Sequence, residues 1–236
     1  MVSIQLKPEY TSRTVGDGLY LSLREDILSL RLKPGEELNI KRMADSLNIS
    51  RSPVRDALMR LAAESLVDIF PQRGCRVSLI DMRRVRQELF LREGVETLAL
   101  EQFVPAARES DFERLEEIIL RQRQAVHAQD QRKLLEYDEE FHALFFDSTG
   151  QSYARRILQN SCAHYRRVRL LSAFYGHIAA GITGEHSLLL QAMRERDVEK
   201  CVRLERAHLH RLDMQQLEME KSRPEYFVPQ AVAALL

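Results

Sequence analysis

Aspartate and histidine side chains of the kind that bind metals occur on three predicted helices. Asp138 and His142 are four residues apart in an amphipathic segment, so both project from one face of one helix. His186 precedes an apolar run, and His208 lies in the last long helical segment. Three imidazoles and a carboxylate suit zinc, nickel or another transition ion, and spacing alone does not choose among them. The pattern indicates that three helices could converge on one divalent ion.

A second pattern overlaps the first and suggests different chemistry. Glu139 and His142 form one Glu-x-x-His motif, and Glu205 and His208 form another. Di-iron carboxylate bundles use two such motifs together with further glutamates, which would make the chain an oxidase or a ferritin-like enzyme. This alternative needs two ions that depend on Glu139 and Glu205, whereas the first needs one ion that depends on Asp138.

A third group of side chains is suited to nucleic acid. Arg51, Ser52 and Arg55 stand at the start of a predicted helix, with Ser52 as its expected cap and Pro53 at its first helical position. Guanidinium groups pair with guanine, hydroxyls bind phosphate, and the helix dipole adds attraction at this end. The alternative is that these arginines decorate a solvated face and pair locally with Asp45 and Asp56.

The elements that would position these groups divide into two sets. An amphipathic helix around residues 19–30, a short helix after Asn39, the arginine-bearing helix and a hairpin of strands at 66–70 and 75–79 follow in the order of a winged helix-turn-helix. From residue 81 onward the periodicity is helical throughout, in the segments 81–103, 111–128, 131–147, 152–174, 184–195 and 198–220. We therefore expect a mainly α protein whose N-terminal winged helix-turn-helix precedes an all-helical bundle.

These patterns predict three parts of the chain and its location in the cell. The expected parts are a DNA-binding domain at 1–79 with its core at 14–79, a helical effector domain at 80–222, and a peripheral tail at 223–236. The chain has no apolar run long enough to span a membrane, and its three cysteines show no metal or disulfide spacing, so we expect no membrane partner and a cytoplasmic location. The formal net charge of zero gives no support for DNA binding.

The N-terminal motif closely resembles one protein family. Residues 50–58 read SRSPVRDAL and are followed by Leu61, Glu64, Leu66 and the Arg73-Gly74 turn, which is similar to the DNA-binding domain of the GntR regulators. The resemblance covers about residues 14–79. It implies a transcription regulator rather than an enzyme, with DNA contacts at Lys41, Ser50, Arg51, Ser52, Arg55, Arg73 and Gly74.

The C-terminal part resembles the helical FCD-type effector domain of the FadR branch of that family, in the subgroup that binds a metal. The resemblance implies Asp138, His142, His186 and His208 as ligands of one divalent ion, and Arg92 as a clamp for a carboxylate effector; a surface ion pair is the alternative for Arg92. It further implies a repressor that small carboxylates release from a double-stranded DNA operator. Because a helix that reads one half-site is usually duplicated by symmetry, we expect a homodimer on a pseudo-palindrome. The alternative is that the metal is purely structural and that no effector binds.

Overall fold

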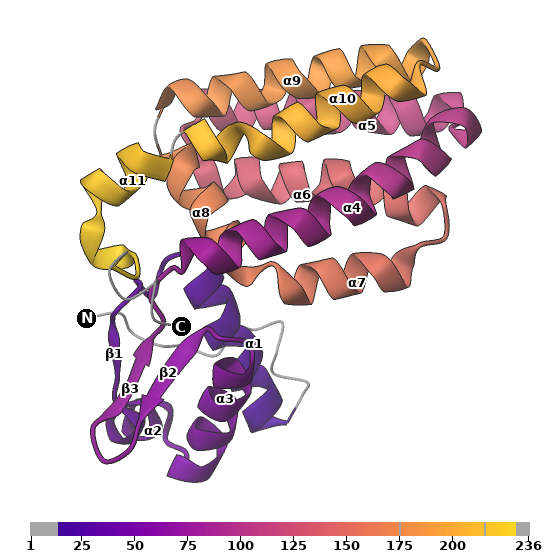
Figure 1. Ribbon diagram of the computed structural model, residues 1–236. Helices are drawn as coiled ribbons and strands as arrows, with labels where there is room; N and C mark the ends of the chain where they lie inside the picture. Colours follow the sequence, from indigo (N-terminus) through magenta and orange to yellow (C-terminus); the bar gives the residue numbers. More distant parts are fainter. Residues whose placement is uncertain (1–13, 175, 215, 230–236) are drawn as a thin grey trace. The chain divides into compact units, whose positions relative to one another are not determined.

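The computed structural model describes residues 14–174, 176–214 and 216–229 (Figure 1). These residues form two compact units, one made of residues 14–83 and 220–229 and the other of residues 84–219. We call them the first and the second unit. The division lies four residues beyond the expected domain boundary at 79, and it assigns the C-terminal segment to the first unit.

Three helices of the first unit follow the predicted order. They are α1 (Val15–Leu28), α2 (Ile40–Leu47) and α3 (Arg51–Ala63). Asn39 caps α2, because its side-chain oxygen accepts a hydrogen bond of 3.0 Å from the Arg42 backbone N–H. Asn48 ends α2 in the left-handed conformation, with φ of 52°, and so makes the turn into α3. Ser50 is the residue before the first turn of α3, where Ser52 was the expected cap.

A small antiparallel sheet completes the winged helix-turn-helix. Its strands are β1 (Glu37–Leu38), β2 (Val67–Phe70) and β3 (Gly74–Val77), in the spatial order β1-β3-β2. Cys75 of the central strand lies opposite both Leu38 and Ile69. Leu19, Leu23 and Ile27 of α1 are fully buried, as is Leu61 of α3, which confirms the predicted apolar faces.

The C-terminal segment packs into the first unit. α11 (Gln216–Ser222) leads to the 3-10 helix η3 (Pro224–Tyr226), and Phe227 then forms a parallel bridge with Ile80. The Ile80 N–H donates to the Tyr226 carbonyl at 2.8 Å, and the Val228 N–H donates to the Ile80 carbonyl at 3.0 Å. Because Phe227 is 4% exposed, the described part of this segment contributes to a core. The sequence had suggested a peripheral tail.

The second unit consists of helices in the described residues. They are α4 (Met82–Ala106), α5 (Glu109–His127), α6 (Gln131–Ser148), α7 (Ser152–Ser161), α8 (Ala163–Ala173), α9 (Gly176–Arg194), α10 (Val198–Leu209) and the 3-10 helix η2 (His210–Met214). The predicted helix at 152–174 is two helices, because the backbone leaves the helical conformation at Cys162. α9 starts eight residues before the expected residue 184.

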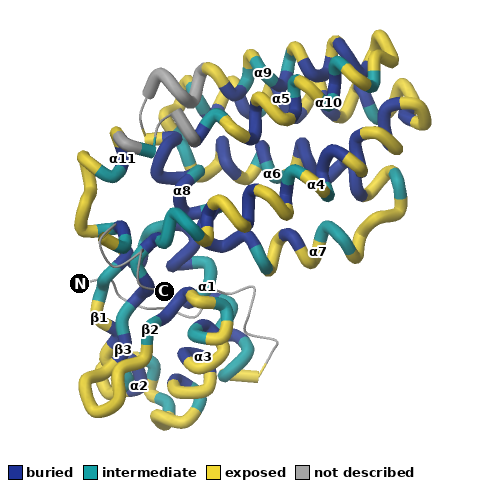
Figure 2. The backbone as a smooth tube through the Cα atoms, in the orientation of Figure 1, coloured by how far each residue is buried: buried dark blue, intermediate teal, exposed yellow. Residues whose placement is uncertain are grey.

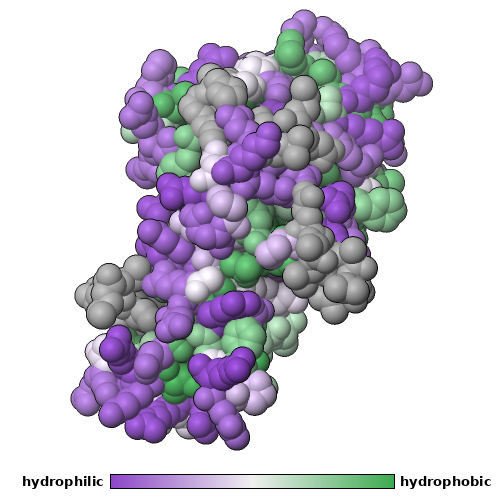
Figure 3. Space-filling model, turned by 60° about the vertical axis from the view of Figure 1, so that its left-hand side comes forward, coloured by the Kyte–Doolittle hydropathy of each residue, from purple (hydrophilic) through white to green (hydrophobic). Residues whose placement is uncertain are grey.

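The mainly α fold class is confirmed, and the helices bury their apolar faces against one another. Buried residues lie on the sides of the helices that face the interior of the bundle (Figure 2). Phe145 of α6 packs against Phe103 of α4 and against Phe141, with ring centroids 5.3 and 5.5 Å apart. The face in Figure 3 is covered mostly by hydrophilic residues. Among the described helices, none combines the length and apolarity that crossing a membrane requires.

Candidate functional site

The first unit carries an open cleft between its helices and its hairpin. Five of the seven predicted DNA contacts line this cleft, namely Lys41, Arg51, Arg55, Arg73 and Gly74. Ser50 and Ser52 lie on either side of Arg51 at the start of α3 and are exposed to solvent. The fold therefore brings the basic end of α3, the start of α2 and the hairpin turn onto one surface.

The cations of this cleft are available to a ligand. Among the described residues, no carboxylate pairs with Arg51 or Arg55, and neither Asp45 nor Asp56 is within ion-pair distance of them. An unpaired guanidinium at a helix N-terminus is suited to a phosphate or to the edge of a guanine. The local ion pairs that would have made these arginines ordinary surface residues are absent from the described chain.

The hairpin turn is shaped by positive φ angles. Gln72 has φ of 60° and Gly74 has φ of 107°, a value that only glycine adopts without strain. No atom lies within 4 Å of the position that a Cβ would take at Gly74. The constraint at Gly74 is thus the backbone conformation, and this conformation places Arg73 at the exposed tip.

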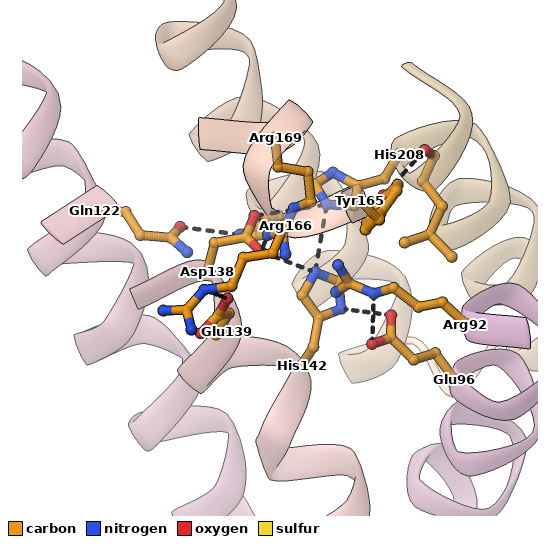
Figure 4. A network of polar contacts seen from close by, with 12 residues as sticks. Arg92, Glu96, Gln122, Asp138, Glu139, His142, Tyr165, Arg166, Arg169 and His208 are labelled. Atoms are coloured by element: carbon orange, nitrogen blue, oxygen red, sulfur yellow. Dashed lines mark hydrogen bonds and ion pairs between the residues drawn. The ribbon is translucent and has the colours of Figure 1, made fainter. Parts of the chain in front are cut away.

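In the second unit, the four predicted metal ligands meet inside the bundle. Asp138 and His142 come from α6, His186 from α9 and His208 from α10, and one potential ligand atom of each lies within 4.8 Å of those of the others. All four residues are at most 6% exposed. Asp138 and His142 are four residues apart, and both side chains point from the same face of α6 into the interior of the bundle, as the sequence predicted (Figure 4).

The nitrogen atoms that face the centre are the Nε2 atoms. His142 Nε2 lies 3.3 Å from His208 Nε2. The Asp138 carboxylate is 3.7 Å from the Nε2 atoms of His142 and His208, and 3.8 Å from that of His186. His186 Nε2 is buried and has no hydrogen-bond partner in the described structure. A buried, unpartnered nitrogen beside a carboxylate is what a metal ligand requires.

The electrostatics keep two of the imidazoles neutral. Burial lowers the pKa values of His186 and His208 well below their usual value, and the neighbouring histidines and arginines lower them further. A neutral ring has a lone pair to offer to a metal, whereas a protonated ring has none. Phe141 fixes the plane of His186 by stacking on it, with centroids 4.0 Å apart and an angle of 3° between the rings.

Arg169 of α8 is a cation of this cluster that the sequence analysis missed. Its guanidinium contacts Asp138 directly, and its side chain is 10% exposed. A buried carboxylate needs a nearby positive charge, and Arg169 provides it here. Burial lowers the pKa of Arg169 well below its usual value.

Two glutamates line the far side of His142. His142 Nδ1 lies 3.1 Å from Glu205 Oε1 and 3.5 Å from Glu96 Oε2. Glu205 is fully buried, whereas Glu139 points away and pairs with Arg166 at 2.9 Å (Figure 4). Only one of the two Glu-x-x-His motifs therefore directs its glutamate into the cluster, which removes the symmetry that a di-iron site would need.

Arg92 lies beside this cluster. Its guanidinium donates to Glu96 Oε1 at 2.8 Å and lies 5.2 Å from the centre of the Tyr165 ring. Burial is the largest single influence and lowers the pKa of Arg92, but Glu96, Tyr165 and Glu205 together outweigh it and raise the pKa above its usual value. The ion pair that was the alternative for Arg92 does exist, but in the interior and not on a surface.

Comparisons with known proteins match each of the two units to a family of domains. Residues 16–77 match the family described as bacterial regulatory proteins, gntR family, and residues 88–211 match the FCD domain. The chain belongs to the GntR family. It is 30% identical, over 225 residues, to the HTH-type transcriptional repressor RspR of Escherichia coli strain K12, covering 94% of this chain and 96% of that protein.

Solved structures of GntR regulators share the fold. E. coli McbR/YncC superposes with a TM-score of 0.71 at 19% identity, covering 89% of this chain and 99% of the other. A regulator from Rhodococcus sp. RHA1 gives a TM-score of 0.75 at 19% identity, with 87% and 99% covered. As a GntR protein with an FCD domain, the chain is a DNA-binding transcription regulator and not an enzyme.

Proposed function

We propose that this GntR regulator is a homodimer that represses transcription from a pseudo-palindromic operator and is released when a small carboxylate binds at a metal centre. The observation that carries the proposal is the buried cluster of one aspartate and three histidines in the FCD domain. In the same chain, the cleft of the first unit is lined by Arg51 and Arg55, which form no ion pair in the described structure. The first feature suits sensing, and the second suits DNA.

The chemistry of the cluster supports one divalent transition ion. Asp138, His142, His186 and His208 would hold it, with zinc or nickel suited to three imidazoles and a carboxylate. When bound, the ion would supply a Lewis acid with coordination positions open to an effector. The buried, unpartnered Nε2 of His186 is accounted for by such an ion and by no group of the described chain.

Formal charge supports an anionic effector. The carboxylates of Glu96, Asp138 and Glu205 and the guanidiniums of Arg92 and Arg169 are nearly or fully buried together and sum to minus one. A divalent ion would change this sum to plus one. A buried excess of positive charge is costly, and a carboxylate relieves it. We propose Arg92 and Arg169 as the residues that face the effector carboxylate.

The DNA-binding role rests on Lys41, Ser50, Arg51, Ser52 and Arg55 together with Arg73 and Gly74 of the hairpin. Arg51 and Arg55 would read bases in the major groove, and the hairpin would follow the neighbouring minor groove. Repression is supported by the relative RspR, which is named a transcriptional repressor. A coupling of about 1–3 kcal/mol between effector and DNA would change operator occupancy roughly 5- to 150-fold.

Metal content is the first test. Elemental analysis of the purified chain should give about one divalent ion per chain. Asp138→Ala and His186→Ala should both lose it, because each removes a ligand, while Glu139→Gln should retain it because that carboxylate pairs with Arg166 instead. Two irons per chain in one coupled site would contradict the proposal and restore the di-iron alternative.

Switching is the second test. Operator affinity of the metal-loaded protein should fall when a panel of sugar acids and hydroxy acids is titrated, and it should not fall for Arg169→Leu. If no carboxylate changes the affinity although one ion is bound, the metal is structural and the sensing proposal is wrong.

A further inference from the structure

Each histidine of the cluster has a second ring nitrogen that faces away from the centre. His142, His186 and His208 all direct Nε2 inward, at 3.7–3.8 Å from the Asp138 carboxylate. Their Nδ1 atoms therefore meet other parts of the bundle. Each of them lies close to an oxygen atom of a neighbouring side chain.

Two of the Nδ1 atoms are hydrogen-bonded to an oxygen, and the third, that of His142, lies beside a carboxylate oxygen without completing a hydrogen bond. His186 Nδ1 lies 2.9 Å from Gln122 Oε1 of α5, and His208 Nδ1 lies 2.7 Å from Glu185 Oε2 of α9. His142 Nδ1 lies 3.1 Å from Glu205 Oε1 of α10. Figure 4 shows Gln122 reaching the cluster from the side opposite to Arg92 and Glu96. The acceptors come from three helices, so packing of the whole bundle brings them to the rings.

In a neutral imidazole ring, the neighbouring group determines which nitrogen carries the proton. A neutral imidazole has one N–H and one lone pair, and an amide or carboxylate oxygen accepts but does not donate. The proton is therefore stabilised on Nδ1, and the lone pair is left on Nε2. Metal-bound histidines commonly donate their other N–H to such an oxygen, which fixes the ring and increases its basicity.

We propose that Gln122, Glu185 and Glu205 are the positioning residues of the metal centre, each holding one histidine with Nε2 directed at the ion. The inference rests on the proposed metal centre, and it extends that centre from four ligands to a second layer on α5, α9 and α10. Glu205 carries the most weight, because it is fully buried and neither its oxygens nor His142 Nδ1 has a hydrogen-bond partner in the described structure, although the two groups are only 3.1 Å apart. Each is the partner that the other lacks.

Glu205 is better suited to this role than to that of a ligand for a second ion. With Glu96 and His142 it forms a buried group that could itself surround a cation. However, the guanidinium of Arg92 already provides positive charge there, 2.8 Å from Glu96. His142 would also have to lose its last ring proton to bind ions at both nitrogens. A single N–H donated to Glu205 requires neither change.

Zinc affinity of the full-length protein, measured by competition with a chelator, tests the proposal. Glu205→Leu removes the acceptor and should weaken zinc binding about 10- to 100-fold, and Glu205→Gln, which keeps an acceptor oxygen, should recover most of this loss. Glu139→Gln is the matched control, since it alters the other Glu-x-x-His motif at a carboxylate that faces Arg166, and it should leave the affinity unchanged. Circular dichroism of the metal-free variants checks folding, and Gln122→Met offers the same test on His186 if Glu205→Leu does not fold.

Nitrogen-15 correlation spectra of the zinc-loaded protein give a readout that loss of packing would not imitate. Nδ1 should be protonated and Nε2 metal-bound in all three rings, and the signals of His142 should change in Glu205→Leu. Unchanged zinc affinity in Glu205→Leu would overturn the positioning role while leaving the metal centre intact. Two zinc ions per chain, one of them lost in Glu205→Leu, would make Glu205 a ligand and also overturn it. If the unaltered protein binds no zinc or nickel, the metal centre itself fails.

Discussion

Arg51 is the side chain on which sequence-specific DNA binding should depend most. It stands in the first turn of α3 within the cleft of the first unit, and no carboxylate of the described chain engages its guanidinium. A guanidinium with no intramolecular partner loses little when it binds DNA, because no existing ion pair must be broken first. Its contribution to folding is small for the same reason.

Arg51→Ala should therefore lose specific operator binding while the fold persists. The expected cost is about 1–3 kcal/mol on an operator selected from random duplexes, with an unchanged thermal unfolding midpoint. Arg86→Ala removes the same charge from an exposed position of α4 and serves as the control. Full specific binding by Arg51→Ala, measured by fluorescence anisotropy, would refute the assigned role.

The sequence predicted the ligand quartet but not the residues around it. Asp138 and His142 share a helix, so their relation follows from helical spacing alone. Glu96, Gln122 and Arg169 lie on other helices, and helix packing decides which buried polar groups they meet. A signal did exist for Gln122: it follows Leu115, Ile118 and Ile119 at helical spacing, so a polar side chain occupies a position of the apolar face, and all four are buried.

Among the elements, the C-terminal segment differs most from its expectation. The sequence predicts a peripheral tail at 223–236, because Pro224 and Pro229 interrupt regular structure. Sequence patterns record local preferences and do not show which strand an extended segment will pair with. In the structure, Phe227 and the backbone around it pair with Ile80. The sequence also did not predict the helix boundaries at Cys162 and at the start of α9. Neither boundary is marked by a proline, so the local sequence gives no clear signal for it.

Phe227→Ala should destabilise the first unit. Removing a ring that is 4% exposed leaves a cavity beside Ile80, and such substitutions cost about 3–5 kcal/mol. Urea unfolding followed by amide hydrogen exchange should show the loss in residues 14–83, with residues 84–219 protected as before. Glu225→Ala, at an exposed position of the same segment, should have no effect. Equal stability of the two variants would mean that the segment does not support this unit.

At the scale of the whole molecule, each chain offers DNA one copy of α3, so we expect a pair of chains on the operator. A single α3 can contact only a few base pairs, and symmetry doubles the site that is read. Light scattering of the complex should give two chains per duplex, and footprinting should show two inverted half-sites centred about 10 base pairs, or a multiple of it, apart. One chain per duplex, or a single protected half-site, would contradict the dimer.

The pairing of Ile80 with Phe227 has a consequence for biosynthesis. Ile80 leaves the ribosome 147 residues ahead of its partner, which at common bacterial rates of about 5–20 residues per second is a delay of roughly 7–30 s. During that interval the second unit can fold, while the first still lacks the segment that covers Ile80. A nascent chain, or one cut short just before Pro224, would therefore carry a complete second unit and an incomplete DNA-binding unit. Translation past Phe227 thus becomes a condition for complete assembly of the first unit.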